Sequence, residues 1–230
     1  MDYRYTYLLM GLVYALIWLI LFFWRKDTRK EMLIFSLMFS AAGPIADVLY
    51  IQDWWHPPNL TNTGIGFEAF LVGFMIGGII AVIYKCVFRK KSEIKKVTKK
   101  EELRKDFKFV LFFIPPAILF FGSFYLLNFS SFHATILSFV VPAIIIWIKR
   151  KDLVVQSLLT GILLVLVASF VYFVLDLLTP GWVNAFWYFK NVPSVIFLNL
   201  PLDDIVWYFV AGLFIGPLYD FWQKSKLVDL

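Results

Sequence analysis

The chain has 230 residues, of which 61% are hydrophobic and 20% aromatic, and its mean hydropathy is +0.77. Soluble domains are nearer half apolar, and apolar runs of about 20 residues are typical of membrane-spanning helices, so the composition excludes an ordinary soluble domain. The formal net charge of +6 does not indicate nucleic-acid binding, because the basic residues lie in blocks between apolar runs.

Hydropathy along the chain predicts an all-α, polytopic membrane protein with seven transmembrane helices. The strongly basic segment Phe88–Lys108 lies between the third and fourth helices, and we expect a solvated connector or, alternatively, a contact with anionic lipid. In chain order, the predicted helices are Tyr5–Trp24, Glu31–Tyr50, Gly64–Phe88, Phe109–Leu127, Phe132–Ile148, Leu153–Leu178 and Pro201–Trp222.

Lysine and arginine are concentrated in the connections on one side of the predicted bundle. If the helices alternate in direction, 20 of the 22 basic residues lie on that side, and only Arg4 and Lys190 lie opposite. Positively charged connections stay in the cytoplasm. The sequence therefore predicts a multi-pass protein of the cell membrane, with its N-terminus outside and its C-terminus cytoplasmic.

Two stretches 135 positions apart resemble each other, each with a helix-breaking residue, an acid and an apolar helix. Gly66 and Glu68 align with Pro201 and Asp203, and an Arg-Lys-Asp turn follows both the first and the fifth helix. We predict a parallel internal repeat of two three-helix units that brings the acid helices together in a central cleft. The predicted parts are residues 1–88 (first unit), 89–131 (basic linker and linking helix) and 132–230 (second unit).

The long connections on the predicted outer side are rich in aromatic residues. Trp54 and Trp55 follow the second helix, and Trp182 and Trp187 precede the last helix. These rings could form the aromatic belt of a membrane interface, or a lid over an apolar cavity. Both interpretations stay open.

The two units, the opening Tyr5-Thr6-Tyr7-Leu8 and the Arg-Lys-Asp turns resemble the lycopene cyclase domain family of small membrane proteins. That family has Pro-x-Glu-Glu at the head of the third helix of each unit. Pro201-Leu202-Asp203-Asp204 keeps this pattern with shorter acids, whereas Gly66-Phe67-Glu68-Ala69 keeps one acid and loses the proline. The resemblance implies acid-catalysed, cofactor-independent cyclisation of a polyene end group in carotenoid biosynthesis.

Such a reaction needs a carboxylic acid that keeps its proton and ring faces that stabilise a cation. We expect Glu68, Asp203 and Asp204 to be the catalytic acids. Asp203 and Asp204 are about 100° apart on a helix, so one of them faces the cleft, and we favour Asp203 because it aligns with Glu68. The expected substrate-binding residues are Asp47, Trp54, Trp55, Phe70, Phe74, Asp176, Trp182, Trp187, Trp207 and Tyr208. Asp47 and Asp176 could instead simply end their helices.

Two other functions stay open. The altered motif fits a non-catalytic isoprenoid- or lipid-binding protein of the same fold. A small proton-coupled transporter would also use carboxylates at membrane depth, but we expect no Arg or Lys inside the helices and a surface position for Asp220. The expected partners are membrane lipid and a hydrophobic isoprenoid, not nucleic acid, and a homo-oligomer stays open.

No cofactor or metal is expected. The chain has no G-x-G-x-x-G motif for a dinucleotide. Its single cysteine, Cys86, excludes an intrachain disulfide, and its only two histidines, His56 and His133, lie in different connections.

Overall fold

The computed structural model describes residues 3–61, 65–95, 97–192, 196–197 and 200–230. Within these ranges, seven helical segments are long and apolar enough to cross a membrane, which confirms the predicted all-α membrane fold. The helices are α1 (Thr6–Trp24), α2 (Arg29–Tyr50), α3 (Phe67–Val87), α4 (Lys99–Phe112), α5 (Ile114–Tyr125), α6 (Ser131–Lys149), α7 (Val154–Leu178), α8 (Trp182–Phe186), α9 (Leu202–Ile215) and α10 (Leu218–Gln223). Short 3-10 turns, Lys26–Thr28 and Lys151–Leu153, precede α2 and α7.

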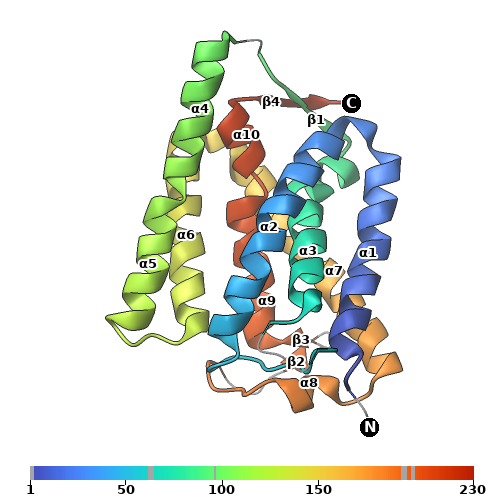
Figure 1. The fold of residues 1–230 in the computed structure, drawn as a ribbon. Coiled ribbons are helices and arrows are strands. Elements are labelled where there is room, and N and C mark those ends of the chain that lie inside the picture. The colour runs from blue at the N-terminus through green and yellow to red at the C-terminus, as the bar shows by residue number, and fades with distance from the viewer. Residues whose placement is uncertain (1–2, 62–64, 96, 193–195, 198–199) are drawn as a thin grey trace.

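Helices α3 and α9 form the centre of the bundle (Figure 1). Helix α3 packs on α1 and α2, and α9 packs on α6 and α7. In each of the two spans that contain α3 and α9, 67% of the apolar window is buried inside the molecule. The corresponding share is 17% in the span of α4 and α5, which lies at the edge of the bundle. Helices α2 and α3 touch at Gly43 and Gly73, where a Cβ on either residue would come within 2.3 Å of a backbone oxygen of the facing helix.

The two ends of the bundle are closed differently. The N-terminus and α8 lie at one end, which we call the α8 end, and the C-terminus lies at the other (Figure 1). At the C-terminal end, strands β1 (Lys90–Glu93) and β4 (Lys226–Asp229) pair antiparallel. At the α8 end, β2 (Ile196–Phe197) pairs with β3 (Leu200–Pro201). The sequence did not predict these short strands.

The basic connector is only partly a coil, because α4 begins ten residues before the predicted fourth helix. Thr98 caps it: the Thr98 Oγ1 accepts from the Glu101 N–H (3.4 Å), and the Glu101 carboxylate accepts from the Thr98 N–H (2.9 Å). This reciprocal capping box stabilises a helix start even where the sequence is polar. Hydropathy alone does not detect such a helix.

The last predicted helix is two helices, because the chain bends between α9 and α10 at Pro217. Proline has no N–H to donate to the carbonyl of Leu213, four residues earlier. The Ser157 hydroxyl of α7 donates to that carbonyl instead, and the Gln156 Nε2 donates to the carbonyl of Gly216 (3.1 Å). Side chains of α7 therefore satisfy the backbone that the break exposes, as a membrane interior requires.

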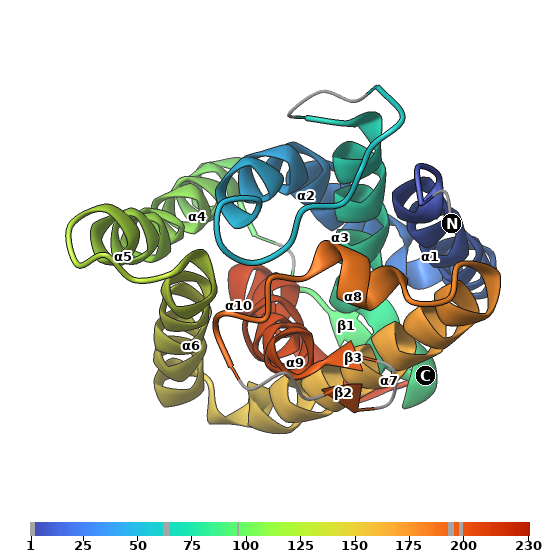
Figure 2. The same ribbon diagram turned by 90° about the horizontal axis from the view of Figure 1, so that it is seen from below.

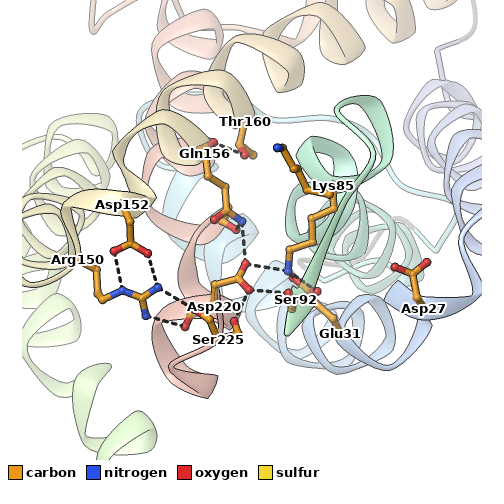
Figure 3. A network of polar contacts seen from close by, with 12 residues as sticks. Asp27, Glu31, Lys85, Ser92, Arg150, Asp152, Gln156, Thr160, Asp220 and Ser225 are labelled. Carbon is orange, nitrogen blue, oxygen red and sulfur yellow. Dashed lines mark hydrogen bonds and ion pairs between the residues drawn. The ribbon is translucent and has the colours of Figure 1, made fainter. Parts of the chain in front are cut away.

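A buried charge cluster joins α2, α3 and α10 near the C-terminal end (Figure 3). The Lys85 Nζ lies 2.7 Å from Glu31 Oε2 and 2.8 Å from Asp220 Oδ2. The expectation of a surface position for Asp220 is wrong, since its side chain is 0% exposed, and so is that of Lys85. The expectation that the helices hold no basic residue inside is also wrong, because Lys85 is buried in α3. Its burial is possible because Lys85, Glu31 and Asp220 neutralise one another.

The two Arg-Lys-Asp turns make matching contacts. Arg25 pairs with Asp27 and donates to the carbonyls of residues 85 and 90. Arg150 pairs with Asp152 and donates to the carbonyls of residues 220 and 225. The accepted carbonyls are 135 positions apart, the same spacing as in the acid motifs. The Lys85–Asp220 ion pair and the Ser92–Leu227 pair of β1 and β4 share this spacing. These contacts favour the internal repeat, which stays a prediction.

Candidate functional site

A cavity of about 170 Å³ lies inside the bundle toward the α8 end, and we call it the central cavity. An engineered apolar cavity of about 150 Å³ holds benzene, so the central cavity suits one ring-sized group rather than a whole polyene. Its wall is mainly aromatic and aliphatic. The lining residues described are Tyr7, Met10, Phe39, Ala42, Gly43, Ala46, Asp47, Tyr50, Trp54, Trp55, Ala69, Val72, Gly73, Ile76, Phe139, Tyr172, Trp187, Asp204, Trp207 and Tyr208.

Two carboxyl groups line the central cavity, and each accepts a hydrogen bond from a tyrosine hydroxyl. Asp204 of α9 accepts from the hydroxyl of Tyr172, and its other oxygen accepts from the Trp187 Nε1 (3.4 Å). Asp47 of α2 accepts from the hydroxyl of Tyr7 (2.8 Å). Helices α2 and α9 lie across the interior from each other when the bundle is seen from the α8 end (Figure 2). The cavity therefore has a carboxyl–phenol pair from each side.

The two carboxyls differ in how local structure places them. Asp204 lies in the first turn of α9, after Pro201, where the helix dipole favours a negative charge. Asp47 lies in the last turn of α2, where the dipole disfavours one. The Tyr7 hydroxyl supplies the hydrogen bond that this position needs. A carboxyl held against the local dipole beside a cavity is a candidate for chemistry.

Of the three expected acids, Asp204 lines the central cavity, while Asp203 and Glu68 lie outside its wall. Asp203 is buried and accepts from the backbone N–H of Asp204 (3.0 Å). Glu68 is also buried, and its Oε1 accepts from the backbone N–H of Leu60 (2.7 Å), so it holds the connection between α2 and α3. Ala69 lines the cavity 135 positions before Asp204. Among residues 1–88, the acid that lines the cavity therefore comes from α2 rather than from α3.

Six of the ten expected substrate-binding residues line the central cavity. These are Asp47, Trp54, Trp55, Trp187, Trp207 and Tyr208. Trp182 packs one layer behind, with its ring centroid 4.8 Å from that of Tyr172. Asp176 is exposed and accepts from the Gly181 N–H (3.3 Å), so it serves the turn after α7.

Phe70 and Phe74 are on α3 but outside the cavity wall. The α3 residues that line the cavity are 69, 72, 73 and 76, which follow helical spacing along one face. Phe70 and Phe74 fall on other faces: Phe70 is 43% exposed, and Phe74 packs on Trp18 with ring centroids 5.5 Å apart. The face that α3 turns inward depends on its packing partners, which its own sequence does not specify.

The two aromatic connections, one after α2 with Trp54 and one after α7 with Trp187, cover the central cavity, and we call them the lid connections. The backbone N–H of His56 donates to Phe186 O (2.9 Å), and the N–H of Tyr188 donates to Trp54 O (3.0 Å). Trp54 and Trp187 are 3% and 5% exposed. Belt tryptophans would face lipid and water, so these positions favour the lid interpretation for this pair.

The sequence did not predict that two tyrosine hydroxyls donate hydrogen bonds to the cavity acids, although Tyr7 lies in the opening motif that carries the family resemblance. Tyr7 is one of many aromatic residues in the first helix, and Tyr172 lies one helical turn before Asp176. Among the described residues, no group of three or more His, Cys, Asp or Glu is placed to hold a metal ion.

Comparisons with known proteins agree with these features. A protein-family model described as lycopene cyclase matches residues 130–222, which include α6 to α9 and the cavity residues Tyr172, Trp187 and Asp204. No curated protein and no solved structure matches the chain. The expected resemblance is confirmed for this part of the chain: residues 130–222 are similar to the lycopene cyclase family.

Proposed function

We propose that this membrane protein cyclises the end group of a polyene by acid–base catalysis in the central cavity, with Asp204 and Asp47 transferring the protons. One observation supports this most: two carboxyl groups line the same aromatic cavity, and each accepts a hydrogen bond from a tyrosine hydroxyl. The cavity is large enough for one six-membered ring. A lycopene-like polyene is the substrate class that the family suggests. Asp204 comes from the expected acids, whereas Asp47 changes from a binding to a catalytic role.

The proposed reaction is an isomerisation, so no electron is gained or lost. One carboxyl adds its proton to the terminal double bond, which leaves a carbocation. The next double bond attacks this cation and closes a six-membered ring. The other carboxyl, as carboxylate, removes a proton from a neighbouring carbon and restores a double bond. The substrate and product therefore have the same atoms, and the mechanism requires one neutral and one ionised carboxyl.

The aromatic wall of the cavity would stabilise the positive charge of the proposed carbocation. Ring faces attract cations, and the strength of this attraction grows when water is excluded. Trp54, Trp207 and Tyr208 line the cavity beside the two acids, and the lid connections cover it at the α8 end. A cavity closed to water also protects a carbocation from hydration.

A second candidate is an isoprenoid-binding protein without catalysis. Glu68 bonds a connection instead of lining the cavity, and Ala69 stands where the second unit has Asp204. This departure between the two units favours the binding function. Transport of a polar solute is disfavoured, because the cavity wall is mostly apolar.

The membrane orientation stays part of the proposal. Both the basic connector and the C-terminal strand lie at the end of the bundle opposite α8 (Figure 1). Positively charged segments favour the cytoplasmic side. We infer that the C-terminal end faces the cytoplasm and the α8 end faces outward. Association into a homo-oligomer stays a prediction.

The proposal is tested by expression in a lycopene-accumulating host with chromatographic separation of the pigments. The wild type should produce a cyclised carotene. Asp204→Asn and Asp47→Asn should each lower its yield by about 100-fold or more, since positioned acids and bases contribute about that much to rate. Asp176→Asn is the matched control, because Asp176 is exposed and outside the cavity wall.

Two results would decide against catalysis by this pair. If the wild type is present in the membrane and lycopene persists unchanged, cyclisation of lycopene is not its function, and the binding function becomes the better account. If Asp176→Asn lowers the yield as strongly as Asp204→Asn, the cavity carboxyls have no special role.

A further inference from the structure

The wall of the central cavity is incomplete on one side. Its residues on α1, α3 and α7 are mostly buried, and the lid residues Trp54 and Trp187 cover the α8 end. On the remaining side, Ala42 of α2 is exposed although it lines the cavity. Phe139 of α6 and Trp207 of α9 line the cavity and are only partly buried. The cavity therefore opens sideways, between α2 and α6.

This opening lies at membrane depth. Helices α2 and α6 are joined near the α8 end, where the Tyr50 and Thr135 hydroxyls lie 3.0 Å apart and the Ser131 N–H donates to Asp53 Oδ2 (2.8 Å). Ala42 is eight residues before Tyr50, which places it roughly 12 Å along the helix from this junction. The opening is thus set back from the α8 end, at a depth where a bundle of membrane-spanning helices would meet the hydrocarbon of the bilayer.

We propose that the polyene enters the central cavity from the bilayer through this opening, which we call the lateral mouth and define by Ala42, Phe139 and Trp207. The cavity holds one end group, and the rest of the polyene stays between the helices and in the lipid. This inference rests on the proposed function for the identity of the ligand, but entry and catalysis can be measured separately.

Three observations support the lateral mouth over entry through the lid. The lid connections are joined by two backbone hydrogen bonds and by stacking of His56 on Tyr188, with ring centroids 4.3 Å apart. The residues of α2 that border the cavity at 42, 43 and 46 are alanine, glycine and alanine, so α2 presents little side-chain bulk there. A volume of about 170 Å³ is too small for a long polyene, so its remainder must leave the cavity, and lipid is the favourable solvent for it.

Because the cavity holds one end group at a time, the products should appear in a defined order. A polyene with two equivalent ends must leave and return with the other end before a second ring can form. A time course with purified protein in lipid nanodiscs should show a one-ring product first and a two-ring product later. A two-ring product that forms without any free one-ring product would overturn single-end occupancy.

Substitutions at two adjacent alanines test the mouth. Ala41 and Ala42 are both exposed on α2, but only Ala42 lines the cavity. Ala42→Trp should lower the lycopene that co-purifies per protein by about tenfold, which is about 1.4 kcal/mol of binding free energy, since the indole would occupy the space through which the polyene leaves the cavity. Ala41→Trp should stay within about twofold of the wild type, because its ring points into lipid.

A second format removes any effect of the large side chain on folding. Ala42→Cys and Ala41→Cys are made separately and labelled in membranes with a bulky maleimide after folding. The native Cys86 is 0% exposed and should not react. Labelling at position 42 should lower both bound lycopene and product, and labelling at position 41 should lower neither. Equal retention of lycopene in both labelled proteins would overturn the lateral mouth.

The outcomes separate entry from catalysis. If the wild type binds lycopene without cyclising it, and a block at position 42 still lowers binding, the mouth is supported and the proposed function fails. If the wild type cyclises lycopene, and blocks at positions 41 and 42 have the same effect, the proposed function is supported and the mouth fails.

Discussion

At the scale of single residues, the site depends on which side chains bond the two cavity carboxyls. Within the described part of the chain, Asp204 accepts hydrogen bonds from Tyr172 and Trp187, and Asp47 accepts one from Tyr7. A phenol beside a carboxyl fixes the direction of its oxygens and so sets where a proton can be delivered. The sequence named both acids and also Trp187, but it could not pair each acid with its donor, because the partners come from segments distant in the chain.

Replacing Tyr172 tests this role. Tyr172→Phe removes the hydroxyl that donates to Asp204, and we expect the yield of cyclised product to fall by about tenfold, since such bonds to charged groups contribute about 1.5–3 kcal/mol. Tyr14→Phe is the matched control: its buried hydroxyl donates to Tyr208 (2.9 Å) and contacts neither carboxyl. An equal loss in both variants, measured by pigment chromatography, would contradict the positioning role of Tyr172.

At the scale of elements, hydropathy predicted where the helices cross the membrane but not where they begin, bend or face. Helix α4 starts inside a polar segment because of its capping box, which carries no hydropathy signal. The bend at Pro217 was readable from the proline itself, but its tolerance depends on Ser157 and Gln156 of α7. The choice between Asp203 and Asp204 depends on helix rotation, and packing sets that rotation.

A double-mutant cycle tests the account of the bend. Ser157→Ala leaves the Leu213 carbonyl without its donor, and we expect the free energy of unfolding to fall by about 1–3 kcal/mol. Pro217→Ala supplies a backbone N–H that can reach the same carbonyl. In that background, Ser157→Ala should therefore have a smaller effect. Additive losses, measured by unfolding in detergent, would mean that the two residues do not share this carbonyl.

At the scale of the whole molecule, the two halves meet in a polar cluster at the C-terminal end and in the cavity toward the α8 end. The cluster places Lys85 between Glu31 and Asp220, and Ser92 and Ser225 donate to Asp220 (Figure 3). The sequence pattern predicted two related units with their acids facing each other. It could not predict that positions 85 and 220 carry opposite charges that pair, because pairing across the units requires their relative placement.

Removing the central charge of this cluster tests how strongly it holds the halves together. Lys85→Met leaves Glu31 and Asp220 buried without their partner, and we expect the free energy of unfolding to fall by about 3–5 kcal/mol. Lys90→Met is the control, since Lys90 pairs with Asp229 at the surface and should change the free energy little. If unfolding in detergent shows that the two variants lose equal amounts of free energy of unfolding, the buried cluster does not stabilise the junction.

The central claim is that the cavity carboxyls add a proton to the substrate, and cyclisation in D₂O measures that step directly. Purified protein in lipid nanodiscs is given lycopene, and the product is weighed by mass spectrometry. Each ring should retain one added deuteron, because the departing proton comes from a different carbon, and Asp204→Asn should form almost no labelled product. A cyclised product without deuterium, or full labelling by Asp204→Asn, would contradict the account.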